Sequence, residues 1–202
     1  MTRYVTYLLM GAPGSGKGTQ GKVLGSVPRF FHFACGEVFR SLDTRSALGQ
    51  KFIKHSSQGQ LVPDDLTVEL WHHHIESQIG TSRFKPDIDA LVLDGIPRNG
   101  NQARLMEAMI EVRQVFHLSC PDRNELVRRL RKRALKDNRL DDVSEAVIRE
   151  RLATYERETK PVLDFYQKKV TTIDALQPPV KVLHDVIETI WATRGNSFTF
   201  NS

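Results

Sequence analysis

Cysteine is scarce in this sequence of 202 residues, and long hydrophobic runs are absent. The two cysteines, Cys35 and Cys120, are far apart and fit neither a disulfide framework nor the ligand spacing of a zinc site, so we expect no structural zinc. No apolar run approaches the length of a membrane span, so we expect no membrane partner. A removable leader is not expected, because a glycine-rich motif already begins at residue 11. These absences predict a protein of the reducing cytoplasm.

Excess charge of one sign is also small, with 29 lysines and arginines against 24 acidic residues and a net charge of +5. The densest basic cluster lies in 128–133, but no aromatic residues alternate with it as they do in a nucleic-acid platform. We therefore expect no nucleic-acid partner and attribute the surplus charge to a site that neutralises small polyphosphates. The length and the apolar content of 40% suit one domain, which we expect to be a monomer.

Short β-prone runs alternate with helical segments, and this alternation predicts an α/β fold of three layers, with a parallel sheet between helices. The expected strands are 4–10, 29–34, 90–94, 114–119 and 169–175. Two helical stretches carry no strand, 35–79 and 130–142, and we expect both to extend from the carboxyl edge of the sheet, where ligands bind in such folds. The expected domain covers 1–194, with its core in 1–34, 80–129 and 143–194 and a mobile tail in 195–202.

Local signals set some of the expected helix boundaries. Pro63 and Asp64 give a break and an N-cap for the helix that follows them. Asp142 and Glu145 have the spacing of a capping box at the start of a long helix. A further helix is expected over 101–110.

The stretch from Gly11 to Gln20 reads GAPGSGKGTQ and follows the β-prone run 4–10. Its glycines let the backbone turn so that successive N–H groups point inward at a phosphate chain. The helix that follows adds its positive N-terminus, and Lys17 reaches the outer phosphates as a point charge. A glycine-rich turn that binds nothing is the alternative, and the order strand, loop, lysine, helix argues against it. The predicted phosphate site consists of Gly14, Ser15, Gly16, Lys17, Gly18 and Thr19.

A second motif, Asp94-Gly95-Ile96-Pro97-Arg98, ends the strand that we expect beside the phosphate loop. At the end of that strand Asp94 is placed to bind Mg²⁺ through water. The alternative is an aspartate that only initiates the next turn. The Gly-x-Pro turn aims the planar guanidinium of Arg98 at one place, which suits a phosphate held by two hydrogen bonds.

Five motifs of this chain occur in the order that they have in adenylate kinases: GAPGSGKGTQ, CGEVFR, GQLVPDDL, LDGIPRNGNQA and NRLDD. As a set they resemble the short-lid adenylate kinases of the nucleoside monophosphate kinase family, and they are far more specific than the phosphate loop alone. The resemblance implies the P-loop NTPase fold, with a monophosphate-binding excursion at 35–79 and a short lid at 130–142. It also implies Mg²⁺-dependent transfer of the γ-phosphate of ATP to AMP, which gives two ADP.

The resemblance implies a role for each matching residue. The resemblance implies that ATP is bound by the phosphate loop and by Arg129 and Arg133. The implied catalytic charges are Lys17, Arg98, Arg133, Arg139 and Arg151. The implied AMP contacts are Cys35, Arg40, Gln60, Leu61, Val62, Gly95, Ile96, Pro97, Arg98, Gln102, Arg139 and Arg151. Among these, Arg40 and Arg98 are expected to hold the phosphate of AMP, and Gln102 to read its base.

Some positions depart from the family pattern. Gly18 stands where the general phosphate-loop pattern has Ser or Thr, so we expect the metal to be held through water and substrate phosphates. Cys35 replaces a threonine of the family pattern. Asn99, directly after Arg98, resembles the residue that the pyrimidine nucleotide kinases of the family carry at this position. A UMP/CMP kinase of the same fold therefore stays open as an alternative, as does a catalytically silent nucleotide-binding protein. Gln102 favours AMP, because its amide offers both a donor and an acceptor to adenine.

Overall fold

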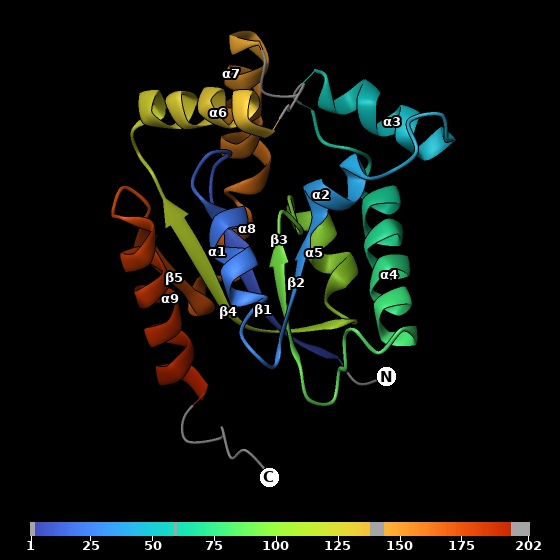
Figure 1. Cartoon of the computed structure of the whole chain (residues 1–202), viewed down its shortest axis with the longest axis vertical. Helices are drawn as coiled ribbons and strands as arrows, with labels where there is room; N and C mark the ends of the chain where they lie inside the picture. The colour runs from blue at the N-terminus through green and yellow to red at the C-terminus, as the bar shows by residue number, and fades with distance from the viewer. Residues whose placement is uncertain (1–2, 59, 138–143, 195–202) are drawn as a thin grey trace.

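The computed structural model describes residues 3–58, 60–137 and 144–194, and its centre is a sheet of five parallel strands in the order β2-β3-β1-β4-β5 (Figure 1). The strands are β1 (Tyr4–Met10), β2 (Phe30–Ala34), β3 (Ala90–Asp94), β4 (Ile110–Ser119) and β5 (Val170–Asp174). Apolar runs such as ALVLD form the inner strands, because helices cover both faces of the sheet and leave it no polar side. The expected parallel sheet is confirmed.

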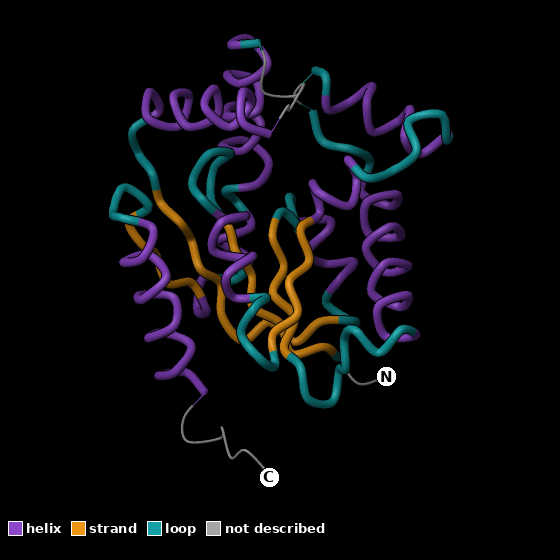
Figure 2. The backbone as a smooth tube through the Cα atoms, in the orientation of Figure 1, coloured by secondary structure: helices purple, strands orange, loops and turns teal. Residues whose placement is uncertain are grey.

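Helices pack on the two faces of this sheet and complete three layers (Figure 2). One layer consists of α1 (Lys17–Leu24) and α9 (Pro179–Arg194), and the opposite layer contains α4 (Asp64–Gly80) and α5 (Gly100–Met106). The other helical segments are α2 (Cys35–Arg40), α3 (Ala47–Ser56), α6 (Arg123–Asp137), α7 (Glu145–Thr154), the π-helical turn η2 (Tyr155–Thr159), α8 (Val162–Phe165) and the 3-10 turn η3 (Gln167–Lys169).

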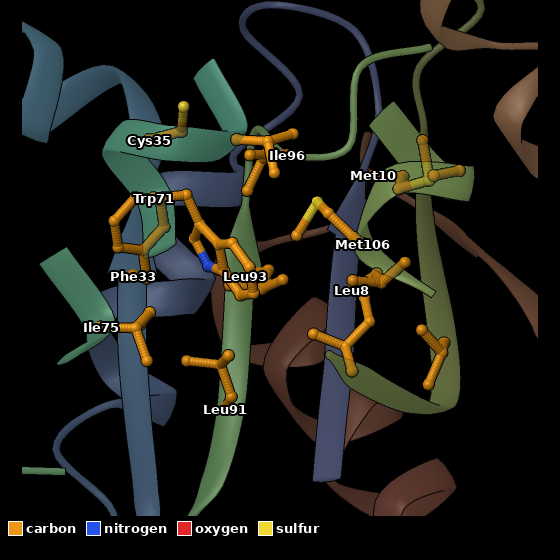
Figure 3. Close-up of a cluster of buried hydrophobic side chains, with 14 of the residues drawn as sticks. Leu8, Met10, Phe33, Cys35, Trp71, Ile75, Leu91, Leu93, Ile96 and Met106 are labelled. Atoms are coloured by element: carbon orange, nitrogen blue, oxygen red, sulfur yellow. The ribbon is translucent and has the colours of Figure 1, made fainter. Parts of the chain in front are cut away.

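Alternate side chains of the strands build the two apolar layers of the core. Leu8 of β1 belongs to the layer that contains Trp71 of α4 and Met106 of α5 (Figure 3). Its neighbour Leu9 belongs to the other layer, with Val186 of α9. Because successive strand residues point to opposite faces, one strand anchors helices on both sides. The phosphate loop that follows β1 therefore starts from a rigid support.

A third apolar cluster fixes α6 and α7 above the carboxyl edge of the sheet. Leu126 and Leu130 of α6 are buried against Ile148 and Leu152 of α7. This packing holds the basic residues of both helices at the end of the molecule toward which the strands point, the same end as α3 (Figure 1). The lid expected over 130–142 thus begins within the packed part of α6, and its last residues, from 138 on, lie outside the described part of the chain.

One helix is shorter in the structure than the sequence predicts. The helix expected over 101–110 ends at Met106, and Ile110 begins β4. Ile110 is buried and pairs with Tyr4 of β1, so the tertiary partner decides the conformation of this residue. The strand expected over 114–119 is therefore longer in the structure, where β4 begins at Ile110 and ends at Ser119.

The helices α4 and α7 begin close to their expected starts, and the structure shows what the acidic side chains at these starts bind. Pro63 is the N-cap of α4, while Asp64 is its first residue and binds side chains of α5 through its carboxylate. Ser144 is the N-cap of α7, and the carboxylate of Glu145 binds the side chains of Arg131 and Arg149. At Asp64 a longer-range polar partner competes successfully with the local cap. Asp142, the other half of the expected capping box, lies outside the described residues.

Among the helices that the structure describes, none combines the length and the apolar content that a bilayer span requires.

Candidate active site

A cavity of about 910 Å³ opens at the carboxyl edge of the sheet, between the phosphate loop, α2, α3, α6 and α7. Its volume lies near the upper end of the roughly 300–1,000 Å³ that ligand pockets generally measure. Most of the predicted site residues line it: Gly14, Ser15, Gly16, Lys17, Gly18, Thr19, Cys35, Arg40, Gln60, Leu61, Val62, Asp94, Gly95, Arg98, Gln102, Arg129, Arg133 and Arg151. Residues from widely separated motifs therefore share one cavity.

The phosphate loop has the geometry of an anion cradle. Gly14 and Gly16 have φ values of 87° and 98°, a left-handed conformation that side chains disfavour. Gly16 is the N-cap of α1, and the N–H groups of Gly16, Lys17 and Gly18 donate to no other described group. The hydroxyl of Ser15 is buried and without a partner in the described chain. Unpaired donors at a helix N-terminus are what a bound phosphate would satisfy.

Lys17 is the cationic centre of the cavity. Its Nζ donates to the carbonyl oxygens of Gly11 at 2.7 Å and Ala12 at 3.1 Å. Burial lowers the pKa of Lys17 to about 8, the carboxylate of Asp94 opposes that shift, and three nearby arginines add to it. These three arginines are Arg133, Arg98 and Arg151. Their effect on Lys17 means that the predicted catalytic cations lie within electrostatic reach of one another.

The two arginines predicted for the acceptor phosphate both fold over a glycine. A Cβ on Gly36 would lie 3.1 Å from a terminal nitrogen of Arg40, and a Cβ on Gly95 would lie 3.3 Å from one of Arg98. Arg98 Nε also donates to the carbonyl oxygen of Gly95 at 2.7 Å. Both guanidinium groups lower the pKa of the Cys35 thiol, although burial dominates and raises it to about 11. Cys35 is therefore a neutral thiol within electrostatic reach of both arginines.

Asp94 has surroundings that suit a hydrated metal ion. It ends β3, next to Leu9 of β1, and so faces the phosphate loop. Its carboxylate accepts no hydrogen bond from the described residues, and a Cβ on Gly18 would lie only 3.4 Å from Oδ2. The glycine after Lys17 thus leaves space in front of the carboxylate. A hard cation with several waters, such as Mg²⁺, fits this acidic, uncrowded position.

Gln102 is fully buried in the cavity wall at the acceptor end, and its amide is already engaged. Its Nε2 donates to Asp64 Oδ1 at 2.8 Å, and its Oε1 accepts from the N–H of Arg98 at 2.7 Å. The predicted base reader is therefore held at both ends. Its distance from Asp64 along the chain, 38 residues, explains why the sequence did not indicate this contact.

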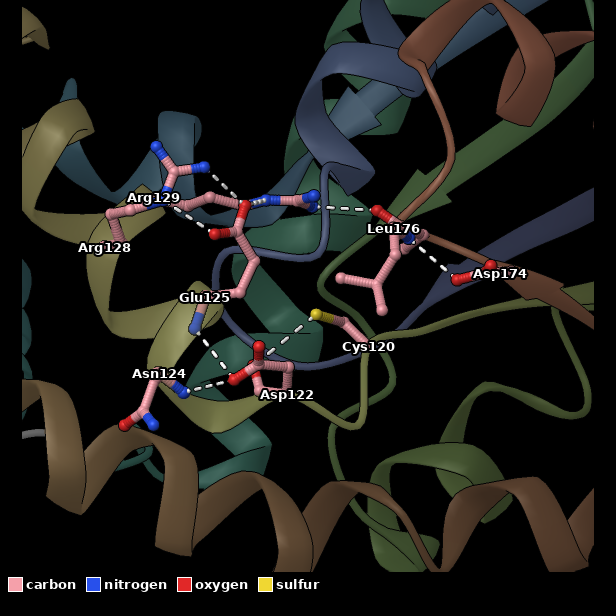
Figure 4. Close-up of polar contacts among 9 residues, drawn as sticks. Cys120, Asp122, Asn124, Glu125, Arg128, Arg129, Asp174 and Leu176 are labelled. Carbon is pink, nitrogen blue, oxygen red and sulfur yellow. Dashed lines mark hydrogen bonds and ion pairs between the residues drawn. The ribbon is translucent and has the colours of Figure 1, made fainter.

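The wall at the donor end is formed by α6 and the segment after β5. Arg129 is held by Glu125 Oε1 at 2.6 Å and by the carbonyl oxygen of Ala175 at 2.9 Å (Figure 4). Arg128 donates to both oxygens of the same carboxylate, at 2.7 Å each. A guanidinium that is fixed in this way presents a flat cationic surface to the cavity. Among the cavity residues that were not predicted are Lys132 and Lys136 of α6, because a basic helix alone does not show which of its charges face a site.

Two of the predicted residues that the structure describes do not line the cavity. Ile96 and Pro97 are buried behind Gly95, and Ile96 belongs to the apolar core. Their hydrophobic character explains this placement, so they support the turn that carries Arg98. Arg139 lies outside the described residues.

Comparison with known proteins gives a consistent result. The chain matches the family model described as adenylate kinase over residues 9–171. It is 37% identical over 179 residues to the adenylate kinase of Cyanothece sp., which covers 85% of this chain and 87% of that protein. It is 35% identical over 188 residues to the adenylate kinase of Porphyromonas gingivalis, with 90% and 87% covered. For the adenylate kinase of Mycoplasma pneumoniae the identity is 32% over 201 residues, with 85% and 91% covered.

Proposed function

This chain belongs to the adenylate kinase family, and on that premise we propose how its residues carry out the reaction ATP + AMP ⇌ 2 ADP. An oxygen of the AMP phosphate attacks the γ-phosphorus of ATP, and the bond to the β–γ bridging oxygen breaks. The names of the relatives favour this reaction over a UMP/CMP kinase and over a silent nucleotide-binding protein. The observation that supports the assignment most is the group of four cations, Lys17, Arg98, Arg133 and Arg151, around one phosphate cradle.

The chemistry needs alignment and charge neutralisation more than a nucleophile or base from the protein. Phosphoryl transfer spreads negative charge over the oxygens in transit, and fixed cations stabilise that charge at no cost of reorganisation. We assign Lys17 and the loop N–H groups to the donor phosphates. Arg133 and Arg151, with Arg139 as a further candidate, neutralise the group in transit. Closure of the segments around the cavity would exclude water, the competing acceptor.

Asp94 is assigned to the metal. Adenylate kinases generally use ATP as its Mg²⁺ complex, and the ion offsets charge on the β- and γ-phosphates when bound. Asp94 would hold it through water, since its carboxylate faces the loop and position 18 is a glycine. We expect no transfer in EDTA and recovery on addition of Mg²⁺. No structural zinc is expected, because Cys35 and Cys120 cannot complete a site of four ligands.

At the acceptor end, Arg40 and Arg98 are assigned to the phosphate of AMP and Gln102 to its base. Arginine suits the phosphate because its fork makes two parallel hydrogen bonds. Val62 and Leu61 supply an apolar wall beside Gln102 in the same cavity. We expect the protein to act as a monomer, because one chain already supplies both ends of the cavity.

A coupled assay with MgATP against AMP, CMP and UMP tests this function. We expect kcat/KM for AMP to exceed that for either pyrimidine nucleotide by at least about tenfold, since an unmatched base leaves buried polar groups unpaired. Gln102→Ala should narrow this ratio, whereas Gln50→Ala, at an exposed position on α3, should leave it unchanged. A wild-type preference for CMP or UMP would overturn the assignment of the acceptor.

A further inference from the structure

Asp64, the first residue of α4, collects three side-chain amides from the start of α5. Its Oδ1 accepts from Asn99 Nδ2 at 2.7 Å and from Gln102 Nε2 at 2.8 Å. Its Oδ2 accepts from Asn101 Nδ2 at 2.9 Å. Asn99 is in addition the N-cap of α5, since its Oδ1 accepts from the N–H of Gln102 at 2.8 Å. The carboxylate therefore holds Gln102 directly and also fixes the turn that carries it.

These contacts permit one orientation of the Gln102 amide. The carboxylate of Asp64 accepts from the nitrogen end, and the N–H of Arg98 donates to the oxygen end at 2.7 Å. If the amide rotated by half a turn, its oxygen would face the carboxylate and its NH₂ would face an N–H group. Both contacts would be repulsive, because a carboxylate only accepts and a backbone N–H only donates. A glutamine without these partners has no such preference, since its two ends have nearly the same shape.

The fixed amide keeps one hydrogen on Nε2 and one lone pair on Oε1 for a ligand. This pair matches a base edge on which a ring nitrogen acceptor lies beside an amino group, as in adenine. Hypoxanthine and guanine have the reverse pattern, a ring N–H beside a carbonyl oxygen. Gln102 lines the cavity but is 0% exposed, so a base contacts its amide only after a movement of the cavity wall, and a mismatch in so enclosed a position leaves polar atoms unpaired.

We propose that Asp64 is a positioning residue that sets acceptor selectivity, because it locks the Gln102 amide in the orientation that takes a 6-aminopurine monophosphate and rejects a 6-oxopurine one. This inference rests on the proposed function, since it takes the acceptor site as assigned above. It adds a residue that does not contact the base and a class of nucleotide that the site excludes. Cytosine has the same hydrogen-bonding polarity as adenine, so the lock does not exclude CMP, and ring size must do so.

Asp64→Asn tests the lock with minimal change of shape. An asparagine amide can donate or accept, so the variant removes the contact that binds only the nitrogen end of Gln102 and leaves the N–H of Arg98 as the remaining restraint. The measurement is kcat/KM for AMP and for IMP, with KM and kcat resolved separately and MgATP saturating. We expect wild-type protein to prefer AMP by about a hundredfold or more, and Asp64→Asn to reduce this ratio at least tenfold, mainly by lowering KM for IMP.

Two controls separate this effect from a general loss of structure. Asp65→Asn removes the neighbouring, exposed carboxylate of the same helix turn and should leave the AMP/IMP ratio unchanged. Asn101→Ala removes the contact to the other oxygen of Asp64 and should change the ratio less than about twofold. Asp64→Ser, whose hydroxyl also donates or accepts, is made in parallel, so that the result does not depend on the folding of one variant.

The outcomes of these measurements test the role of Asp64 separately from the proposed transfer of phosphate to AMP. A wild-type protein without transfer to AMP would overturn the proposed function. A wild-type protein that transfers to AMP and IMP equally would overturn the lock alone. So would equal losses for both nucleotides in Asp64→Asn and Asp64→Ser, because a merely structural role lowers both rates without changing their ratio.

Discussion

The donor end and the acceptor end of the cavity are built in different ways. In our proposal the donor end would take its phosphate contacts from one continuous loop, 11–19, and largely from backbone N–H groups. The acceptor end brings together side chains of α2, α4 and the turn before α5. Backbone N–H groups bind phosphate whatever base is attached to it, whereas a locked side-chain amide matches one kind of base edge. The difference implies a permissive donor end and a strict acceptor end.

The largest expected effect comes from removing the central cation of the donor end. Lys17→Ala should lower kcat by about 100–1,000-fold, since loss of one preorganised contact to a transition state costs roughly 3–4 kcal/mol. The fold, followed by circular dichroism, should be unchanged. Lys85→Ala, at an exposed lysine remote from the cavity lining, is the matched control and should retain full turnover. Near-normal turnover in Lys17→Ala would remove the basis for the donor assignment.

The second effect is confined to the acceptor end. Arg40→Ala should raise KM for AMP by about tenfold to a hundredfold, because a hydrogen bond to a charged group contributes about 1.5–3 kcal/mol. KM for ATP should change little, and this separation of the two substrates is the informative measurement. Arg45→Ala, on the same excursion and paired with Asp43 in solvent, should change neither. Equal increases in both KM values would mean that the two ends are not separate.

The pH dependence should also differ between the two ends. The pKa of Lys17 is lowered to about 8, so its ammonium is charged below that pH and neutral above it. We expect kcat/KM for MgATP to fall about tenfold per unit above pH 8. With ATP saturating, kcat/KM for AMP should stay nearly constant to pH 9, because bound phosphate keeps Lys17 charged and arginine does not titrate there. If kcat/KM for MgATP stayed constant up to pH 9.5, this result would contradict the role of Lys17.

The smallest effect is a difference in thiol reactivity. Cys35 at the acceptor end is 1% exposed, and its pKa is raised to about 11 by burial. Cys120 is partly exposed and lies beside the donor wall (Figure 4). Iodoacetamide at pH 8 should therefore label Cys120 at least about tenfold faster than Cys35, as measured by peptide mass spectrometry. Both should react alike in urea, and preferential labelling of Cys35 in the native protein would show that the acceptor end is open to solvent.

The same contrast explains what the sequence could predict. The parallel sheet and the phosphate loop were predictable, because each depends on contiguous residues: apolar runs such as ALVLD, and GAPGSGKGTQ. The arginines of the motifs were predictable only through resemblance to a family. The partner of Gln102 was not, since Asp64 read locally as a helix cap while its contacts lie 35 to 38 residues away. Local patterns do not show which distant side chain a polar group will meet.

The most direct test compares base selectivity at the two ends of one protein. The measurement is kcat/KM for ATP, GTP and CTP with AMP saturating, and for AMP, IMP and CMP with ATP saturating. The account predicts that the acceptor series spans a range at least about tenfold wider than the donor series. The reason is that Gln102, at the acceptor end, is the one amide among the described cavity residues that is held at both its nitrogen and its oxygen. Equal ranges, or a wider range among the donors, would contradict it.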